Sequence, residues 1–116
     1  MHELAIAEEI LTTAKAHDGP DRRIARIEVS IGPFSGVMRE SLEFCFDLAA
    51  KHFGMEGTQL QIEQLTAEAT CPVCGVGTRV DNMWTACAAC GHSPLTVEGG
   101  RELRVNRLII EEDEHV

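Results

Sequence analysis

Apolar and polar residues follow two different periods along the chain. Residues 2–17 and 37–53 carry apolar side chains at intervals of three and four, which predicts an amphipathic helix in each segment. Residues 24–31, 58–65 and 102–110 alternate between apolar and polar positions over most of their length, which predicts three β-strands. The predicted order is therefore helix, strand, helix, strand, a cysteine-containing segment and a last strand.

These elements predict an α+β fold in which two helices cover one face of a three-stranded mixed sheet. The first strand and the second helix form a crossover to a neighbouring strand, and the second and third strands are expected to pair antiparallel as a hairpin. Ser35 is the expected N-cap of the second helix. The expected apolar face of that helix consists of Met38, Leu42, Cys45, Phe46, Ala49 and Phe53.

Two Cys-x-x-Cys-Gly sequences between the second and third strands are the most specific signal in the chain. They are Cys71-Pro-Val-Cys74-Gly and Cys87-Ala-Ala-Cys90-Gly, with residues 75–86 between them. Each turn can present two thiolates to one ion, and the following glycine relieves backbone crowding so that amide N–H groups turn toward the sulfurs. Two such turns predict a closed, tetrahedral four-cysteine site, the usual form of structural zinc. The insert is therefore a predicted zinc ribbon.

Other interpretations of the four cysteines remain. Iron in a rubredoxin-like site is the main alternative, because Cys-Pro-x-Cys-Gly also suits iron. A rubredoxin usually surrounds its metal with aromatic residues, whereas only Trp84 lies between the two turns and the chain has no tyrosine. Disulfides within the turns are inconsistent with a cytosolic chain, whose thiols stay reduced, and buried free thiols are a further alternative. A fully ligated ion leaves no open position for water or substrate, so the site is expected to support folding and not catalysis.

The charge balance excludes some partners. Ten Lys and Arg residues against nineteen Asp and Glu residues give a net charge of −9. Nucleic-acid binding needs a basic surface, and the sequence offers none. No apolar run approaches the roughly 20 residues that a membrane-spanning helix needs. Met1 leads directly into His2-Glu3 without a basic leader, so we expect a cytoplasmic protein with no membrane association.

The N-terminus offers a second candidate metal site. A helix that begins there brings together the α-amine of Met1, the imidazole of His2 and the uncommitted backbone nitrogens of His2 and Glu3. Such nitrogen sets, with deprotonated amides, suit square-planar Ni(II) or Cu(II) better than zinc. On spacing alone, a histidine at position 2 is more often only a polar residue at a frayed terminus.

In combination, the N-terminal Met1-His2-Glu3 and the two cysteine pairs resemble the HypA/HybF family of hydrogenase nickel-incorporation proteins. The similarity covers nearly the whole chain. The other segments that carry it are Ser30-Ile31-Gly32, Ser35-Gly36-Val37, Leu42-Glu43-Phe44-Cys45-Phe46-Asp47, Glu56-Gly57-Thr58-Gln59-Leu60 and Gly100-Arg101-Glu102-Leu103.

The resemblance implies a nickel metallochaperone and not an enzyme. It implies that nickel is transiently bound cargo, delivered to the large subunit of [NiFe]-hydrogenase together with a HypB-like GTPase; some relatives also serve urease. The implied nickel-binding α/β domain comprises residues 1–69 and 98–116, and the zinc-ribbon domain residues 70–97. A homodimer is compatible with the sequence. The implied ligands are Met1, His2 and Glu3 for nickel, and Cys71, Cys74, Cys87 and Cys90 for zinc.

Two other function classes stay open at the level of the residues. Besides metal delivery, the residues allow a zinc-ribbon protein-interaction module in which Met1-His2 is incidental, and a rubredoxin-like electron carrier. Trp84 either contacts a partner or covers the zinc site. Cys45 is expected to be a small buried residue, and His92 and His115 are not expected to be ligands.

Overall fold

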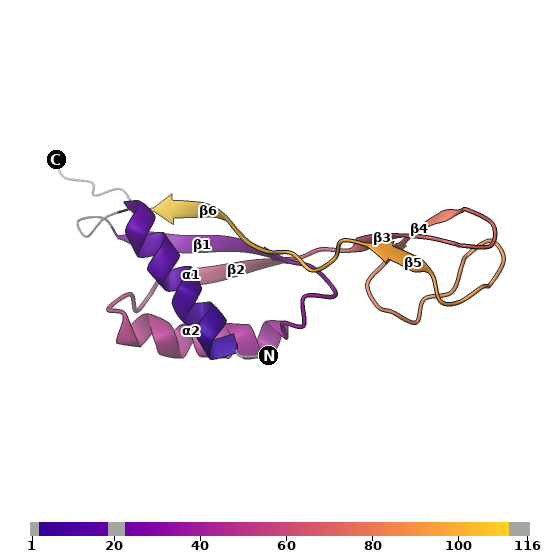
Figure 1. Ribbon diagram of the computed structural model, residues 1–116. Helices are drawn as coiled ribbons and strands as arrows, with labels where there is room; N and C mark the ends of the chain where they lie inside the picture. The colour runs from indigo at the N-terminus through magenta and orange to yellow at the C-terminus, as the bar shows by residue number, and fades with distance from the viewer. Residues whose placement is uncertain (1–2, 19–22, 112–116) are drawn as a thin grey trace. The chain divides into compact units, whose positions relative to one another are not determined.

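The computed structural model describes residues 3–18 and 23–111, and it contains all five segments expected from the periodicity (Figure 1). The cysteine-containing segment adds three short strands that the sequence patterns do not reveal. In chain order the elements are α1 (Glu3–Asp18), β1 (Ile24–Ile31), α2 (Arg39–His52), β2 (Gln59–Gln64), β3 (Ala67–Thr70), β4 (Gly77–Val80), β5 (Thr96–Glu98) and β6 (Leu103–Ile110).

The first sheet has the strand order β2-β1-β6. The hydroxyl of Thr58 donates to the carbonyl of Ile24 at 2.7 Å, and the amide of Leu65 donates to the carbonyl of Ile31 at 2.8 Å. Both contacts join residues with the same sequence offset, so β2 runs parallel to β1. The predicted crossover through α2 is therefore confirmed.

The last strand pairs on the opposite side of β1. The amide of Gly32 donates to the carbonyl of Glu102 at 2.8 Å, and the amide of Glu111 donates to the carbonyl of Arg23 at 2.9 Å, which makes β6 antiparallel to β1. The sheet is mixed, as expected, but the predicted hairpin between the second and third strands is wrong. The reason is burial: five of the eight residues of β1 are buried, whereas β2 has one buried residue and β6 has none. The most buried strand is the central one.

The core of the first sheet lies under two helices that pack against each other. Neither α1 nor α2, the helices of the described part of the chain, has the length and apolar character needed to cross a membrane. Met38 is 63% exposed and Cys45 is half-buried, so the predicted apolar face of α2 is wrong at Met38. The buried hydrophobic residues of the two helices and the first sheet are Ala7, Ile10, Leu11, Ala14, Ile24, Ile27, Val29, Ile31, Leu42, Phe46, Ala49, Ala50 and Ile62.

The N-terminus of α2 also differs from expectation. The helix begins at Arg39, with Met38 as its N-cap, and no side chain of the cap residue bonds to the first turn. Ser35 is therefore not the cap, because it lies too far before the first helical residue. Glu3 at the start of α1 lies close instead: its carboxylate Oε2 accepts a hydrogen bond from the amide of Met38 at 3.3 Å.

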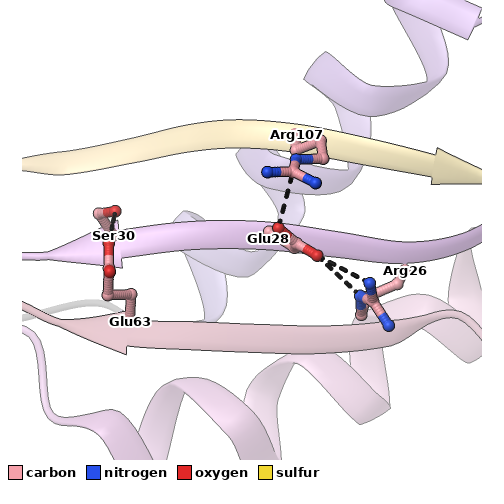
Figure 2. Close-up of polar contacts among 5 residues, drawn as sticks. All are labelled: Arg26, Glu28, Ser30, Glu63 and Arg107. Atoms are coloured by element: carbon pink, nitrogen blue, oxygen red, sulfur yellow. Dashed lines mark hydrogen bonds and ion pairs between the residues drawn. The ribbon is translucent and has the colours of Figure 1, made fainter.

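Charged and polar side chains of the first sheet contact one another within and between its strands (Figure 2). Glu28 on β1 uses both carboxylate oxygens: Arg26 lies 2.9 Å from Oε2, and Arg107 of β6 lies 3.5 Å from Oε1. Farther along the strand, the hydroxyl of Ser30 donates to Glu63 at 3.0 Å. These contacts give the first sheet a charged surface without a basic patch.

The second sheet has the order β4-β3-β5, with both neighbours antiparallel to β3. Its buried residues are few and small, namely Ala67, Ala69 and Val80, with Phe34, Leu95 and Val97 packed against them. The chain forms two compact units, and this sheet belongs to the unit made of residues 30–36 and 63–104. The domain boundaries expected from the sequence are different, because they place only residues 70–97 in the zinc-ribbon domain. These boundaries stay a prediction.

Two glycines in the second unit allow a close approach of backbone to backbone. A Cβ on Gly32 would overlap the carbonyl group of Gly100, and a Cβ on Gly100 would lie 2.6 Å from the ring of Phe34. The amide of Phe34 donates to the carbonyl of Gly100 at 2.6 Å, which holds the two segments together. Only a residue without a side chain fits at position 32.

We therefore expect Gly32→Ala to lower the free energy of unfolding by about 1–3 kcal/mol, the usual cost of overpacking. Gly77→Ala is the matched control, since its φ is not positive and nothing lies within 4 Å of an added Cβ. Urea unfolding followed by circular dichroism compares the two variants with the wild type. Equal midpoints for both variants would show that the segments at Gly32 and Gly100 can separate without cost.

Candidate metal centre

The first Cys-x-x-Cys turn begins immediately after β3. The amide of Gly75 donates to the carbonyl of Cys71 at 2.9 Å, and the amide of Cys71 donates to the carbonyl of Val76 at 3.0 Å. Gly75 has a φ of 80°, a value that side chains other than glycine rarely adopt. This left-handed residue closes the turn and directs the amide of Cys74 toward the Cys71 sulfur, at 3.4 Å.

The second turn repeats the first bond for bond. The amide of Gly91 donates to the carbonyl of Cys87 at 2.8 Å, and the amide of Cys87 donates to the carbonyl of His92 at 2.8 Å. Gly91 has a φ of 78°, and the amide of Cys90 lies 3.5 Å from the Cys87 sulfur. The expected role of the two glycines is therefore visible in the backbone geometry.

The two turns bring four sulfur atoms together. Every pair of the four lies within 4.8 Å, with Cys71 and Cys90 at 3.6 Å and Cys74 and Cys87 at 3.5 Å. A tetrahedral ion with zinc–sulfur bonds of about 2.3 Å requires sulfur–sulfur distances of about 3.8 Å. The cluster is close to this size, so the four residues fit a single tetrahedral cation.

The backbone around the sulfurs favours ionisation of the first cysteine of each turn. The amide of Cys90, followed by that of Ala89, lowers the pKa of Cys87 to about 6. The amide of Cys74 likewise lowers the pKa of Cys71. Hydrogen bonds to thiolates stabilise the charged form. Part of the cost of forming a metal-binding thiolate is thus offset by the fold itself.

The second cysteines behave in the opposite way. The amide of His92 lowers the pKa of Cys90. Hydrogen bonds between the Cys90 thiol and the other three sulfurs, together with burial, outweigh this effect and raise the pKa to about 12. The amide of Val76 lowers the pKa of Cys74. Hydrogen bonds between the Cys74 thiol and the sulfurs of Cys87 and Cys71, together with burial, raise this pKa by more, so the net shift is upward. Four adjacent thiolates repel one another, and a divalent cation can replace the shared protons.

Other residues considered as ligands lie outside this cluster. Among the described residues, the four cysteines are the only group of three or more His, Cys, Asp or Glu side chains arranged to hold a metal ion. His92 approaches the turn through its backbone carbonyl, and Cys45 lies on α2. Trp84 is 81% exposed, so it does not shield the sulfurs. Its amide donates to the Asn82 side chain at 2.8 Å.

Of the three residues expected to bind nickel, only Glu3 lies within the described part of the chain. Met1, His2 and also His115 lie outside the described residues. Glu3 is the first residue of α1, and its carboxylate bonds to the amide of Met38. Sequence analysis missed this contact, since it joins residues 35 positions apart and no periodicity marks it.

Comparisons with known proteins agree with the resemblance seen in the sequence. The family model "Hydrogenase/urease nickel incorporation, metallochaperone, hypA" matches residues 1–110. A "Hydrogenase maturation factor HypA" from a Geobacter species is 34% identical over 111 residues, covering 96% of this chain and 100% of the relative. The protein with the same name from Chlorobaculum tepidum is 36% identical over 113 residues, again covering 96% and 100%.

A solved structure shares the fold. The solution structure of the Ni metallochaperone HypA from Helicobacter pylori aligns with a TM-score of 0.63, covering 97% of this chain and 100% of that chain. The sequence identity in this alignment is 19%, so the likeness concerns the fold alone.

The four-cysteine cluster predicts one tightly held zinc per chain. Cys87→Ser removes one of the four thiolates, and we expect the variant to lose bound metal and the ordered second unit, because that unit has a small core. Cys45→Ser is the control, since Cys45 is the fifth cysteine and lies on α2. Elemental analysis and circular dichroism measure both effects. A red protein containing iron, or full zinc in Cys87→Ser, would contradict the prediction.

Proposed function

The chain belongs to the HypA family of hydrogenase/urease nickel-incorporation metallochaperones, and we propose that it binds Ni(II) at its N-terminus and delivers the ion for maturation of [NiFe]-hydrogenase. The observation that carries this proposal is the family match over residues 1–110, which includes Met1-His2-Glu3 and all four cysteines. The relatives over nearly the full chain are named hydrogenase maturation factors, which favours hydrogenase over urease as the recipient.

The proposed nickel ligands are nitrogen atoms of the first three residues. The α-amine of Met1, the imidazole of His2 and the backbone nitrogens of His2 and Glu3 offer a set that suits square-planar Ni(II). Glu3 begins α1, and the first amides of a helix have no intrahelical acceptor. The backbone nitrogen of Glu3 is therefore not committed to the helix.

The proposed role of the four cysteines is structural. Zinc is the ion that best suits four thiolates in tetrahedral arrangement, and when bound it supplies cross-links between the two turns. The chain's own contribution is the pair of glycine turns and the amides directed at Cys71 and Cys87. In this proposal, residues 70–97 form the zinc-ribbon domain, and residues 1–69 and 98–116 carry the nickel site.

The proposed activity is transfer of cargo, with no bond-making chemistry on a substrate. A terminal site allows a recipient to replace the ligands one at a time, whereas the four-cysteine site is closed. The proposed partners are a HypB-like GTPase and the large subunit of [NiFe]-hydrogenase. A net charge of −9 is compatible with protein partners and unfavourable for nucleic acid. The cytoplasmic location and a homodimer stay predictions.

The N-terminal site is tested by titrating Ni(II) into zinc-loaded protein with a native N-terminus. We expect the wild type to bind one nickel per chain with the d–d absorption band of a planar complex, and His2→Ala to lose both. Wild-type protein acetylated at the Met1 α-amine is the control for the amine, because acetylation removes this ligand without changing the position of His2. If His2→Ala binds nickel as the wild type does, the ion lies elsewhere, and the chain is better described as a zinc-ribbon interaction module.

Nickel affinity is expected to fall as pH is lowered through about 8 to 6.5, the range in which α-amines and imidazoles take up protons. The sign follows from competition, because the amine, imidazole and amides bind nickel only after losing a proton. Dissociation constants measured by competition with a chelator at several pH values should rise more than about tenfold across this range. An affinity independent of pH would indicate carboxylate oxygen ligands instead.

A further inference from the structure

The second helix lacks a cap of its own. Its N-cap residue Met38 has φ −90° and ψ 122°, and its apolar side chain makes no cap hydrogen bond. In a capping box, a Glu or Gln three residues into the helix accepts a bond from the N-cap amide. The residue at that position of α2 is Ser41. The carboxylate of Glu3 accepts the bond from the Met38 amide instead, at 3.3 Å.

The opposite end of α2 is also bound by α1. The ammonium group of Lys15 donates to the carbonyl of Phe53, the C-cap of α2, at 3.0 Å. The first helix thus places a negative group at the positive end of α2 and a positive group at its negative end. Arg39, the nearest cation in sequence to the N-cap, is paired with Glu43 at 3.4 Å.

Glu3 has two separable parts with different tasks. Its backbone nitrogen belongs to the proposed nickel-binding segment, whereas its carboxylate bonds to Met38 across 35 positions of sequence. Since Glu3 is covalently bonded to His2, a fixed Glu3 fixes the base of that segment. This interpretation rests on the proposed N-terminal nickel site.

We propose that Glu3 is a positioning residue whose carboxylate anchors the nickel-binding segment to the N-terminus of α2 and does not coordinate nickel. The anchor slows fraying of the first turn of α1, so it slows stepwise loss of the ligands. Nickel release is then faster when the bond to Met38 is absent, although the ligand set is unchanged.

The test compares Glu3→Ala, Glu3→Gln and Lys15→Met with the wild type, all with native N-termini and zinc loaded. Lys15→Met is the matched control, because it removes the α1 contact at the other end of α2. We expect all four proteins to bind one nickel with the same d–d band. Transfer of nickel to excess EDTA should be about fivefold faster in Glu3→Ala, the size expected for one lost helix cap, and unchanged in Lys15→Met.

Two further readouts separate anchoring from general destabilisation. In the nickel-free protein, the Met38 amide should exchange with solvent faster in Glu3→Ala than in Lys15→Met. Glu3→Gln keeps an oxygen acceptor and should fall between the wild type and Glu3→Ala in both exchange and transfer. A changed d–d band in Glu3→Ala would make the carboxylate a ligand and overturn the proposal, as would a transfer rate equal to the wild type.

The same experiment distinguishes the two proposals. Nickel bound by the wild type and lost in His2→Ala, with unaltered release from Glu3→Ala, rejects only the anchor. Nickel bound equally by the wild type and His2→Ala rejects the N-terminal site and the anchor with it.

Discussion

The convergence of four cysteine sulfurs is the constraint on which the second unit depends. The buried hydrophobic cluster of its three-stranded sheet consists of two alanines and a valine, with partly buried neighbours, which is too little apolar surface to hold three short strands by itself. The two glycine turns bring the sulfurs within 4.8 Å, where four thiolates are unstable without a cation. A metal ion therefore supplies the cross-links that a larger hydrophobic core supplies elsewhere. This explains why a unit with so small a core still needs specific glycines at positions 75 and 91.

The first unit is stabilised in a different way. Its helices bury Ala, Ile, Leu and Phe side chains, and its central strand β1 is the most buried strand of the sheet. The ends of α2 are bonded by Glu3 and Lys15 of α1, which matches charge to the helix dipole at both ends. The start of α1, at Glu3, is thus bonded to the start of α2. In the proposed function, the residues that bind and release nickel directly precede this contact in the sequence.

Much of this arrangement could be predicted from the sequence. Periodicity located both helices and the three long strands to within two residues, and the cysteine spacing located the metal centre. The strand order could not be predicted correctly, because pairing depends on which strand is most buried and not on which strands are adjacent in the chain. The strands β3, β4 and β5 are three or four residues long, too short for a period to show. The Glu3–Met38 contact depends on tertiary packing and has no local signal.

The two proposed metal sites need opposite properties, and they use different segments of the chain accordingly. A structural ion must not exchange, so its four ligands come from two turns that close around it, with Cys71 and Cys87 buried. A cargo ion must exchange, so its ligands belong to the chain terminus, where they can leave one at a time. Nitrogen ligands do not select nickel, since Cu(II) binds such sites more tightly. Selectivity for nickel must therefore come from supply and from the partners that accept it, and the acceptor needs to recognise the terminus together with the surface next to it.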